Sequence, residues 1–264
     1  MAGLLGINRK RIYYQGSQEA KDLATKAQIV ATHKTHPAYG HKRLALELKA
    51  NKKKILRVMH KYGIKPPRRK ARKKWLTEAV FDHHYTNLIK DLIVVKPEQI
   101  WVSDLTYLEY RGRFFYLETV EDVFTREVVG MGMSDKHDSV LALSAIRMAV
   151  ETTVKGPEFF HFDQGRENLA QIVTEFLENH GSKVSVSDKG SPWQNGYKES
   201  FFGRFKNEFG DINRFESLGE LVEEVYAAIY YYNHLRIHTS LKMPPVQFKQ
   251  QFQASESLSR KWGT

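Results

Sequence analysis

Three acidic residues, Asp104, Asp163 and Glu199, have the types and the surroundings that phosphoryl-transfer chemistry needs. Asp104 lies within the apolar, strand-like run 100–107, Asp163 ends a second such run, 159–163, and Glu199 lies in a stretch with helical periodicity. A carboxylate beside apolar strands costs free energy unless a partner neutralises it. Three converging carboxylates therefore predict a divalent-cation site, and oxygen ligands favour Mg²⁺ or Mn²⁺ over zinc.

Taken singly, each of these residues has an ordinary structural explanation, as a helix cap, a surface ion pair or, for Asp163 before Gln164 and Gly165, the start of a turn. The combination is harder to obtain by accident. Three carboxylates can hold two metal ions about 3.5–4 Å apart, one activating water or a 3′-hydroxyl group and the other stabilising the leaving oxygen. This pattern predicts in-line phosphoryl transfer. The sequence lacks the Gly-rich phosphate-binding loop that would indicate a nucleotide hydrolase.

The helix expected to carry Glu199 has two distinct faces. At about 100° per residue, Glu199, Gly203 and Lys206 share one face. An aromatic face, expected to point toward the core, is formed by Tyr197, Phe201, Phe205 and Phe209. Gly203 would clear space for a substrate backbone or, equally well, allow close helix packing. Lys206 is a candidate for a phosphate contact near the metal ions.

Charge divides the 264-residue chain into two parts. Residues 1–96 carry 23 Lys and Arg against 6 Asp and Glu, a net +17, whereas residues 97–264 carry 18 against 24, a net −6. The clustering favours a nucleic-acid partner, although a single charge run is as often a solvated surface. The absence of cysteine fits a reducing compartment and excludes thiolate zinc sites. Since the apolar runs are too short for a bilayer, we expect a soluble, cytoplasmic protein without a membrane partner.

Apolar periodicity predicts three helices in the basic part, over about 18–34, 41–49 and 52–62. One face of the first helix is expected to carry Leu23, Ala27, Val30 and Ala31. Asn51 is a candidate N-cap for the third helix, and Gly63 would end it. A tight turn between short helices, the second with a basic outer face, indicates a DNA-binding helix-turn-helix rather than a plain hairpin with solubilising lysines. The basic face comprises Lys52, Lys53, Lys54, Arg57 and Lys61.

A basic linker follows, in which six of the nine residues 66–74 are Lys or Arg. These cations would track a phosphate backbone with little sequence preference, and the segment would also serve as a tether. They are Arg68, Arg69, Lys70, Arg72, Lys73 and Lys74.

From residue 97 onward, strand and helix patterns alternate. The expected strands are 100–110, 113–121, 126–134, 158–163 and 183–187, and the main expected helices are 138–153, one ended by Gly181, the Glu199 helix and 217–235. Hairpin-linked strands followed by helical crossovers predict an α/β fold with a mixed five-stranded sheet and flanking helices, preceded by a small all-α domain. The expected regions are a helix-turn-helix-like DNA-binding region (1–65), the basic linker (66–96), a catalytic core (97–210) and a C-terminal helical extension (211–264).

Four further sequence blocks stand in a fixed order. They are Trp101-x-x-Asp104-Leu105-Thr106, His161-Phe162-Asp163-x-Gly165, the glutamate block from Ser187 to Glu208, and Tyr232-Asn233-x-x-Arg236-x-His238 continuing to Pro245. With Tyr39-Gly40-His41-Lys42-Arg43 upstream, the blocks span about residues 36–248. In order and spacing they resemble the DDE transposases of the retroviral-integrase superfamily and, more closely, the OrfB products of the IS-three group of insertion sequences.

The resemblance implies a ribonuclease-H-like fold in which Asp104, Asp163 and Glu199 bind two Mg²⁺ ions, which Mn²⁺ can replace. It implies cleavage at transposon ends, followed by strand transfer by the freed 3′-hydroxyl group. Double-stranded DNA is then the partner, and a homodimer or a larger assembly on DNA is the active form. An upstream-frame protein is a further partner in that group, and the bacterial cytoplasm, close to the nucleoid, is the expected location.

The chain departs from that family at Phe162, where a small hydroxyl residue is usual, and at Gln194, where an aspartate is usual. Neither change removes a metal ligand. Arg236 and His238 would contact DNA or tie the C-terminal helix to the core, and we favour the tie. Two other functions stay open. A DNA-binding regulator or domesticated relative would not need the three carboxylates, and a general ribonuclease-H-like nuclease would not need the basic helices.

Overall fold

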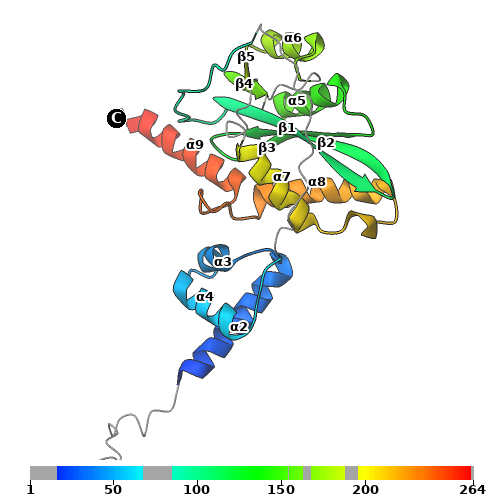
Figure 1. Ribbon diagram of the computed structural model, residues 1–264. Helices are drawn as coiled ribbons and strands as arrows, with labels where there is room; N and C mark the ends of the chain where they lie inside the picture. Colours follow the sequence, from blue (N-terminus) through cyan, green and yellow to red (C-terminus); the bar gives the residue numbers. More distant parts are fainter. Residues whose placement is uncertain (1–16, 68–84, 154, 163–167, 188–195, 263–264) are drawn as a thin grey trace, which may run out of the picture. The chain divides into compact units, whose positions relative to one another are not determined.

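A helical unit, which ends at Pro67, and a larger unit built on a β-sheet make up the chain, and each is described by itself (Figure 1). The computed structural model describes residues 17–67, 85–153, 155–162, 168–187 and 196–262. None of the described helices is long and apolar enough to cross a lipid bilayer.

The helical unit consists of α2 (Ser17–Thr35), α3 (His41–Glu47) and α4 (Lys52–Lys61). The side chain of Asn51 accepts a hydrogen bond from the backbone N–H of Lys53 at 2.8 Å, which confirms the expected N-cap of α4. Gly63 adopts a positive φ of 66°, a conformation that favours glycine, where the helix ends. The core between the helices contains Ile29, Tyr39, Leu44, Ile55, Val58 and Met59.

The apolar face of the first helix is exposed in the structure. Leu23 and Val30 are 49% and 46% exposed, and Ala27 and Ala31 are also exposed. The buried face of α2 is formed instead by Asp22, Thr25 and Ile29. Apolar periodicity thus marks the helix but not its buried face, since the buried carboxylate of Asp22 is paired with cations of α4.

The sheet of the larger unit has the strand order β3-β2-β1-β4-β5, which confirms the expected mixed five-stranded α/β fold. Its strands are β1 (Ile100–Tyr110), β2 (Arg113–Asp122), β3 (Val128–Ser134), β4 (Phe159–Phe162) and β5 (Lys183–Val186). The first three form an antiparallel meander, and β4 and β5 run parallel to β1. The short hairpin and the long helical crossovers in the sequence require this mixture of pairings.

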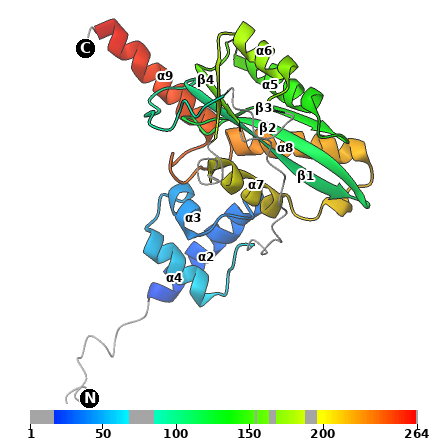
Figure 2. The same ribbon diagram turned by 45° about the horizontal axis from the view of Figure 1, so that its top comes forward.

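Helices cover both faces of the sheet (Figure 2). On one face, α5 (Ser139–Thr153) and α6 (Gln171–Asn179) pack against Trp101, Val120, Phe160 and Phe162. On the other face, α7 (Gly196–Phe209) and α8 (Leu218–His234) pack against Leu108, Tyr110, Phe115 and Leu117. A 3-10 turn, η2 (Ile212–Arg214), precedes α8, and α9 (Pro245–Trp262) follows it.

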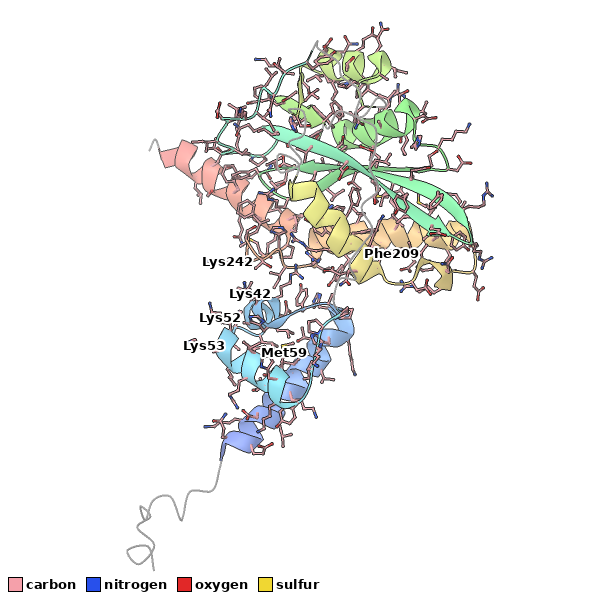
Figure 3. The ribbon with its side chains drawn as sticks, in the orientation of Figure 1. Lys42, Lys52, Lys53, Met59, Phe209 and Lys242 are labelled. Carbon is pink, nitrogen blue, oxygen red and sulfur yellow. The ribbon has the colours of Figure 1, made fainter. Side chains whose placement is uncertain are left out.

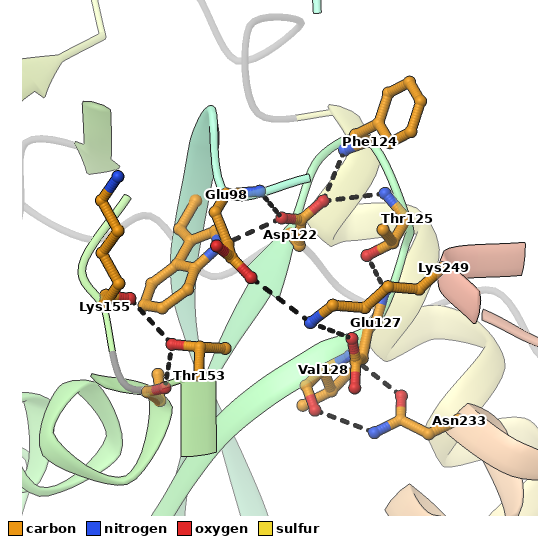
Figure 4. Close-up of polar contacts among 12 residues, drawn as sticks. Glu98, Asp122, Phe124, Thr125, Glu127, Val128, Thr153, Lys155, Asn233 and Lys249 are labelled. Carbon is orange, nitrogen blue, oxygen red and sulfur yellow. Dashed lines mark hydrogen bonds and ion pairs between the residues drawn. The ribbon is translucent and has the colours of Figure 1, made fainter. Parts of the chain in front are cut away.

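The turn between β2 and β3 is organised by the buried carboxylate of Asp122 (Figure 4). It accepts hydrogen bonds from the backbone N–H groups of Phe124 and Thr125 at 2.9 and 2.8 Å, and from the indole of Trp101 at 3.2 Å. Arg126 in this turn has a positive φ of 63°, so β3 begins at Val128, two residues later than expected. The turn therefore fixes the start of β1 against the end of β2.

Candidate active site

Asp104 lies in the middle of β1 and is half-buried. Because side chains alternate along a strand, Asp104 shares a sheet face with Leu108 and Tyr110, which pack against α7 and α8. Its register partner on β2 is Thr119, which is fully buried. One carboxylate oxygen, Oδ1, accepts the backbone N–H of Leu105 at 2.9 Å. The first predicted carboxylate is therefore on the face of the sheet that the Glu199 helix covers.

Asp163 lies outside the described residues. The residue before it in the chain, Phe162, is the last of β4, which runs parallel to β1. In this pairing His161 is opposite Val102, so the described register stops two residues before each of the two aspartates. His161 is fully buried, and its Nδ1 lies 3.0 Å from the hydroxyl of Ser185 on β5.

Glu199 lies on α7, and its side chain is outside the described part of the chain. The aromatic face predicted for this helix is confirmed at Phe201, Phe205 and Phe209, which are 4–6% exposed and belong to the core shared with α8. Their rings follow one another at centroid distances of 6.1 and 5.2 Å. Burial of these phenylalanines thus holds α7 on the sheet. Phe209 is labelled in Figure 3.

Lys206, which shares a face of α7 with Glu199, reaches β1. Its ammonium group donates a hydrogen bond to the carbonyl oxygen of Tyr107 and lies 4.6 Å from the centroid of the Tyr107 ring. Tyr107 is three residues beyond Asp104 on the same strand. The flank of α7 that carries Lys206 is therefore turned toward the strand that carries Asp104.

The donor set suits a hard divalent cation, since all three predicted ligands are carboxylates. Within the described ranges, no three His, Asp, Glu or Cys side chains come together as a metal site. Asp104 is the predicted ligand whose side chain the structure describes, and it is half-buried on the sheet face that packs against α7 and α8.

The basic face of α4 divides into two groups of residues. Lys52, Lys53 and Lys54 are exposed at the beginning of the helix, and Figure 3 labels the first two. Arg57 instead forms a fork with Asp22 of α2, with Nη1 and Nη2 at 2.8 and 2.5 Å from the two carboxylate oxygens. Lys61 also binds Asp22, at 3.0 Å. Hydrogen bonds from Arg57 and Lys61 hold the pKa of the Asp22 carboxyl well below its usual range.

The cations of the predicted linker, Arg68, Arg69, Lys70, Arg72, Lys73 and Lys74, lie outside the described residues. The C-terminal motif, in contrast, is described in full. Arg236 is 1% exposed and binds Glu208 of α7, which confirms the structural role favoured for it. His238 forms a backbone bridge with Met243, and its Nδ1 lies 2.9 Å from the Ser240 hydroxyl.

Comparison with known proteins agrees with this geometry. Two family profiles, both described as Integrase core domain, match residues 94–192 and 180–245. The chain is 28% identical over 226 residues to the putative transposase InsK for insertion sequence element IS150 of Escherichia coli, covering 83% of this chain and 80% of InsK. It is also 28% identical over 211 residues to the transposase InsF for insertion sequence IS3A of Escherichia coli, covering 76% of this chain and 72% of InsF.

Among solved structures, the chain is similar to the HTLV-2 integrase catalytic core domain in complex with magnesium. The TM-score is 0.50 at 22% identity, and the match covers 59% of this chain and 98% of the integrase core. This similarity shows a common fold. The sequence matches, in turn, show that the chain belongs to the retroviral-integrase superfamily, as a transposase of the IS3 group of insertion sequences.

Proposed function

We propose that this transposase cleaves DNA at the ends of its insertion sequence and joins the freed 3′-hydroxyl groups to target DNA, with Asp104, Asp163 and Glu199 as the ligands of two Mg²⁺ ions. The observation that carries the proposal is the position of Asp104, on the sheet face under α7 and inside the matched integrase core. The magnesium in the HTLV-2 integrase structure supports the choice of metal, and Mn²⁺ would substitute for it.

Several described residues would support this chemistry. The phenylalanines of α7 hold the helix on the sheet, so that Glu199 is carried by a fixed element. Lys206 and Glu199 are seven residues apart, which places them within about 20° of each other around α7. Because Lys206 contacts Tyr107, Glu199 is expected on the flank facing β1. The bound ions would activate the attacking oxygen and stabilise the leaving oxygen.

The basic residues of the N-terminal part would hold the DNA. We assign DNA binding to residues 1–65, with Lys52, Lys53 and Lys54 as phosphate contacts, and to the linker 66–96 with its six clustered cations. Arg57 would add its charge from the position that Asp22 fixes, and Lys206 would place a cation near the reacting phosphate. Catalysis is assigned to residues 97–210, with 211–264 as a helical extension. The active form would be a homodimer or larger assembly that bridges two ends, with an upstream-frame protein as a further partner.

Cleavage of a plasmid that carries the gene's own flanking DNA, in Mg²⁺ or Mn²⁺, tests the proposal. The native protein should nick element ends and form joined products, whereas Asp104→Asn and Glu199→Gln should lose cleavage by several orders of magnitude but keep DNA binding. The matched control is Glu109→Gln, because Glu109 is an exposed carboxylate on β1, five residues from Asp104. Full cleavage by either triad variant would show that the site assignment is wrong.

The same assay separates the alternative functions. Specific binding without cleavage by the native protein would indicate a DNA-binding regulator or a requirement for the upstream-frame partner. Cleavage of RNA–DNA hybrids without strand joining would indicate a general nuclease.

A further inference from the structure

The motif Tyr232-Asn233-x-x-Arg236 holds a buried charge that the chemistry proposed above does not use. The guanidinium of Arg236 is 1% exposed, and its Nε and Nη2 donate hydrogen bonds to the two carboxylate oxygens of Glu208 at 2.6 and 2.5 Å. Although burial disfavours the charge, the hydrogen bonds to Glu208 keep the pKa of Arg236 above its usual value. A fork of two parallel bonds fixes orientation as well as distance, because both acceptors must stay in the guanidinium plane.

The neighbouring residue Asn233 attaches the same segment to the sheet. Its Nδ2 donates to the carbonyl oxygen of Val128 at 2.8 Å, and its Oδ1 accepts the N–H of Val128 at 2.9 Å (Figure 4). Val128 begins β3, which is an edge strand of the sheet. The side-chain amide of Asn233 therefore pairs with the backbone of Val128 as a neighbouring strand would. Tyr232 packs edge-on against Phe201 of α7, at a centroid distance of 5.0 Å. The motif therefore connects α7 to a fixed point on the sheet.

Two polar ties lie on opposite flanks of α7. Lys206 is bound to the carbonyl oxygen of Tyr107 on β1, and Glu208 is bound to Arg236 after α8. The two residues are separated by about 200° around the helix. The phenylalanines between them hold α7 on the sheet, but apolar packing fixes the rotation of a helix less sharply than directional hydrogen bonds do. With both ties in place, rolling in either direction breaks a hydrogen bond.

We propose that Arg236, anchored through Asn233, is a positioning residue that sets the rotation of α7 and so holds Glu199 in place opposite Asp104. The inference rests on the proposed function, because it requires Glu199 to bind metal. A change in the rotation of α7 would move Glu199 across the sheet face while leaving the phenylalanine core and the DNA-binding region intact. Metal affinity would then suffer more than folding.

Metal binding by the full-length protein tests this inference. Mn²⁺ affinity is measured by calorimetry without DNA, next to the melting temperature and the Mn²⁺ concentration for half-maximal cleavage. Loss of a residue that orients a ligand typically costs 10–100-fold in metal affinity, so Arg236→Gln should weaken Mn²⁺ binding about 10–100-fold. Arg236→Lys, which keeps the buried charge but loses the fork, should fold more stably than Arg236→Gln and still bind Mn²⁺ less tightly than the native protein.

Lys249→Gln is the matched control. Lys249 forms ion pairs that hold α9 on the rest of the unit, at 3.2 Å from Glu127 and 3.6 Å from Glu98. Removing them should lower the melting temperature without changing Mn²⁺ affinity. The double variant Arg236→Gln with Glu208→Gln should regain part of the affinity, because two carboxamides can pair side by side and the two changes are coupled.

If Arg236→Gln and Arg236→Lys only lower the melting temperature, as Lys249→Gln does, and leave the Mn²⁺ affinity unchanged, the positioning role is wrong. The proposed metal site would not be affected by that result. A native protein whose Mn²⁺ binding is the same as that of Asp104→Asn would overturn the proposed metal site itself, and the positioning role with it.

Discussion

Several partly or fully buried carboxylates of this chain have a structural role, and a different role is proposed for Asp104. Asp22, Asp122 and Glu208 accept several hydrogen bonds from groups of other elements or of the adjoining turn, and they fix a helix pair, a turn and the α7–α8 contact respectively. Asp104 instead lies on the sheet face that α7 covers. A carboxylate held by donors of several elements stabilises a fold, and we expect Asp104, which accepts the N–H of Leu105 within its own strand, to serve as a metal ligand.

Asp22→Asn tests the structural purpose. The depressed pKa of Asp22 means that its ion pairs stabilise the helical unit fully above its unfolded pKa of about 3.9, and that this contribution is lost as the pH falls below that value. Asp22→Asn should therefore lower the protection of the α2 and α4 amides against exchange at pH 7. It should also remove the loss of protection that acid causes in the native protein. Hydrogen exchange followed by mass spectrometry measures both, with the amides of β1 as the internal control. Equal exchange at pH 7 in both proteins would contradict this role.

Residue patterns predicted the elements that carry Asp104 and Glu199 better than they predicted the contacts of the helical unit. The contexts of Asp104 and Glu199 follow from local sequence, since an apolar strand and an amphipathic helix are each visible in a short window. The pairing of Arg57 with Asp22, 35 residues away, is not visible in such a window. Periodicity placed Arg57 on the outer face, where it is indeed exposed, but it gave no sign that the guanidinium pairs with the buried Asp22.

At the scale of elements, the close approach of α5 to β3 depends on two glycines. A Cβ atom at Gly130 would lie 2.2 Å from the carbonyl oxygen of Ala145 and 2.7 Å from the Cβ of Ala149. A Cβ atom at Gly132 would lie 2.4 Å from the hydroxyl of Ser144. The strand range 128–134 was foreseen to within two residues, but this contact was not, because glycine lowers strand propensity without showing which element approaches it.

Gly130→Ala should destabilise the larger unit by about 1–3 kcal/mol, because the backbone of α5 must move to admit the methyl group. Gly219→Ala in the first turn of α8 is the matched control. Its nearest neighbour would be the Ser217 hydroxyl at 3.7 Å, so the free energy of unfolding should stay the same or rise by up to about 1 kcal/mol. Urea unfolding followed by tryptophan fluorescence compares the two. Equal midpoints for both variants would show that α5 is not held as closely as the contact distances indicate.

Most other elements could be predicted because their boundaries are set locally. The range 100–110 coincides with β1, and Gly181, with a positive φ of 78°, follows α6 as expected. The ends of β2 and β3 depend instead on Asp122 and on contacts from Asn233, which comes more than 100 residues later in the chain. The same long-range contact gives the C-terminal motif its role, which local spacing left open between DNA and structure.

Across the whole molecule, the basic excess of residues 1–96 is separated from the acidic excess of residues 97–264. Since an acidic part that binds metal ions would still repel DNA, we expect the attraction for DNA to come from the basic part. Each neutralised phosphate releases counterions, so log affinity should fall linearly with log salt by about 0.9 per contact.

Replacing the six clustered linker cations, Arg68, Arg69, Lys70, Arg72, Lys73 and Lys74, by glutamine should reduce the magnitude of this slope by up to about 5. The reason is that each cation contributes its contact independently of DNA sequence. Titrations with end-containing and unrelated DNA at several NaCl concentrations measure the slopes, and both should fall equally. Neutralising the exposed Lys136 and Lys155 of the larger unit is the control and should leave the slope unchanged. If the slope of log affinity against log salt is unchanged by the linker substitutions, the linker serves only as a tether. The attraction for DNA would then come from the helical unit.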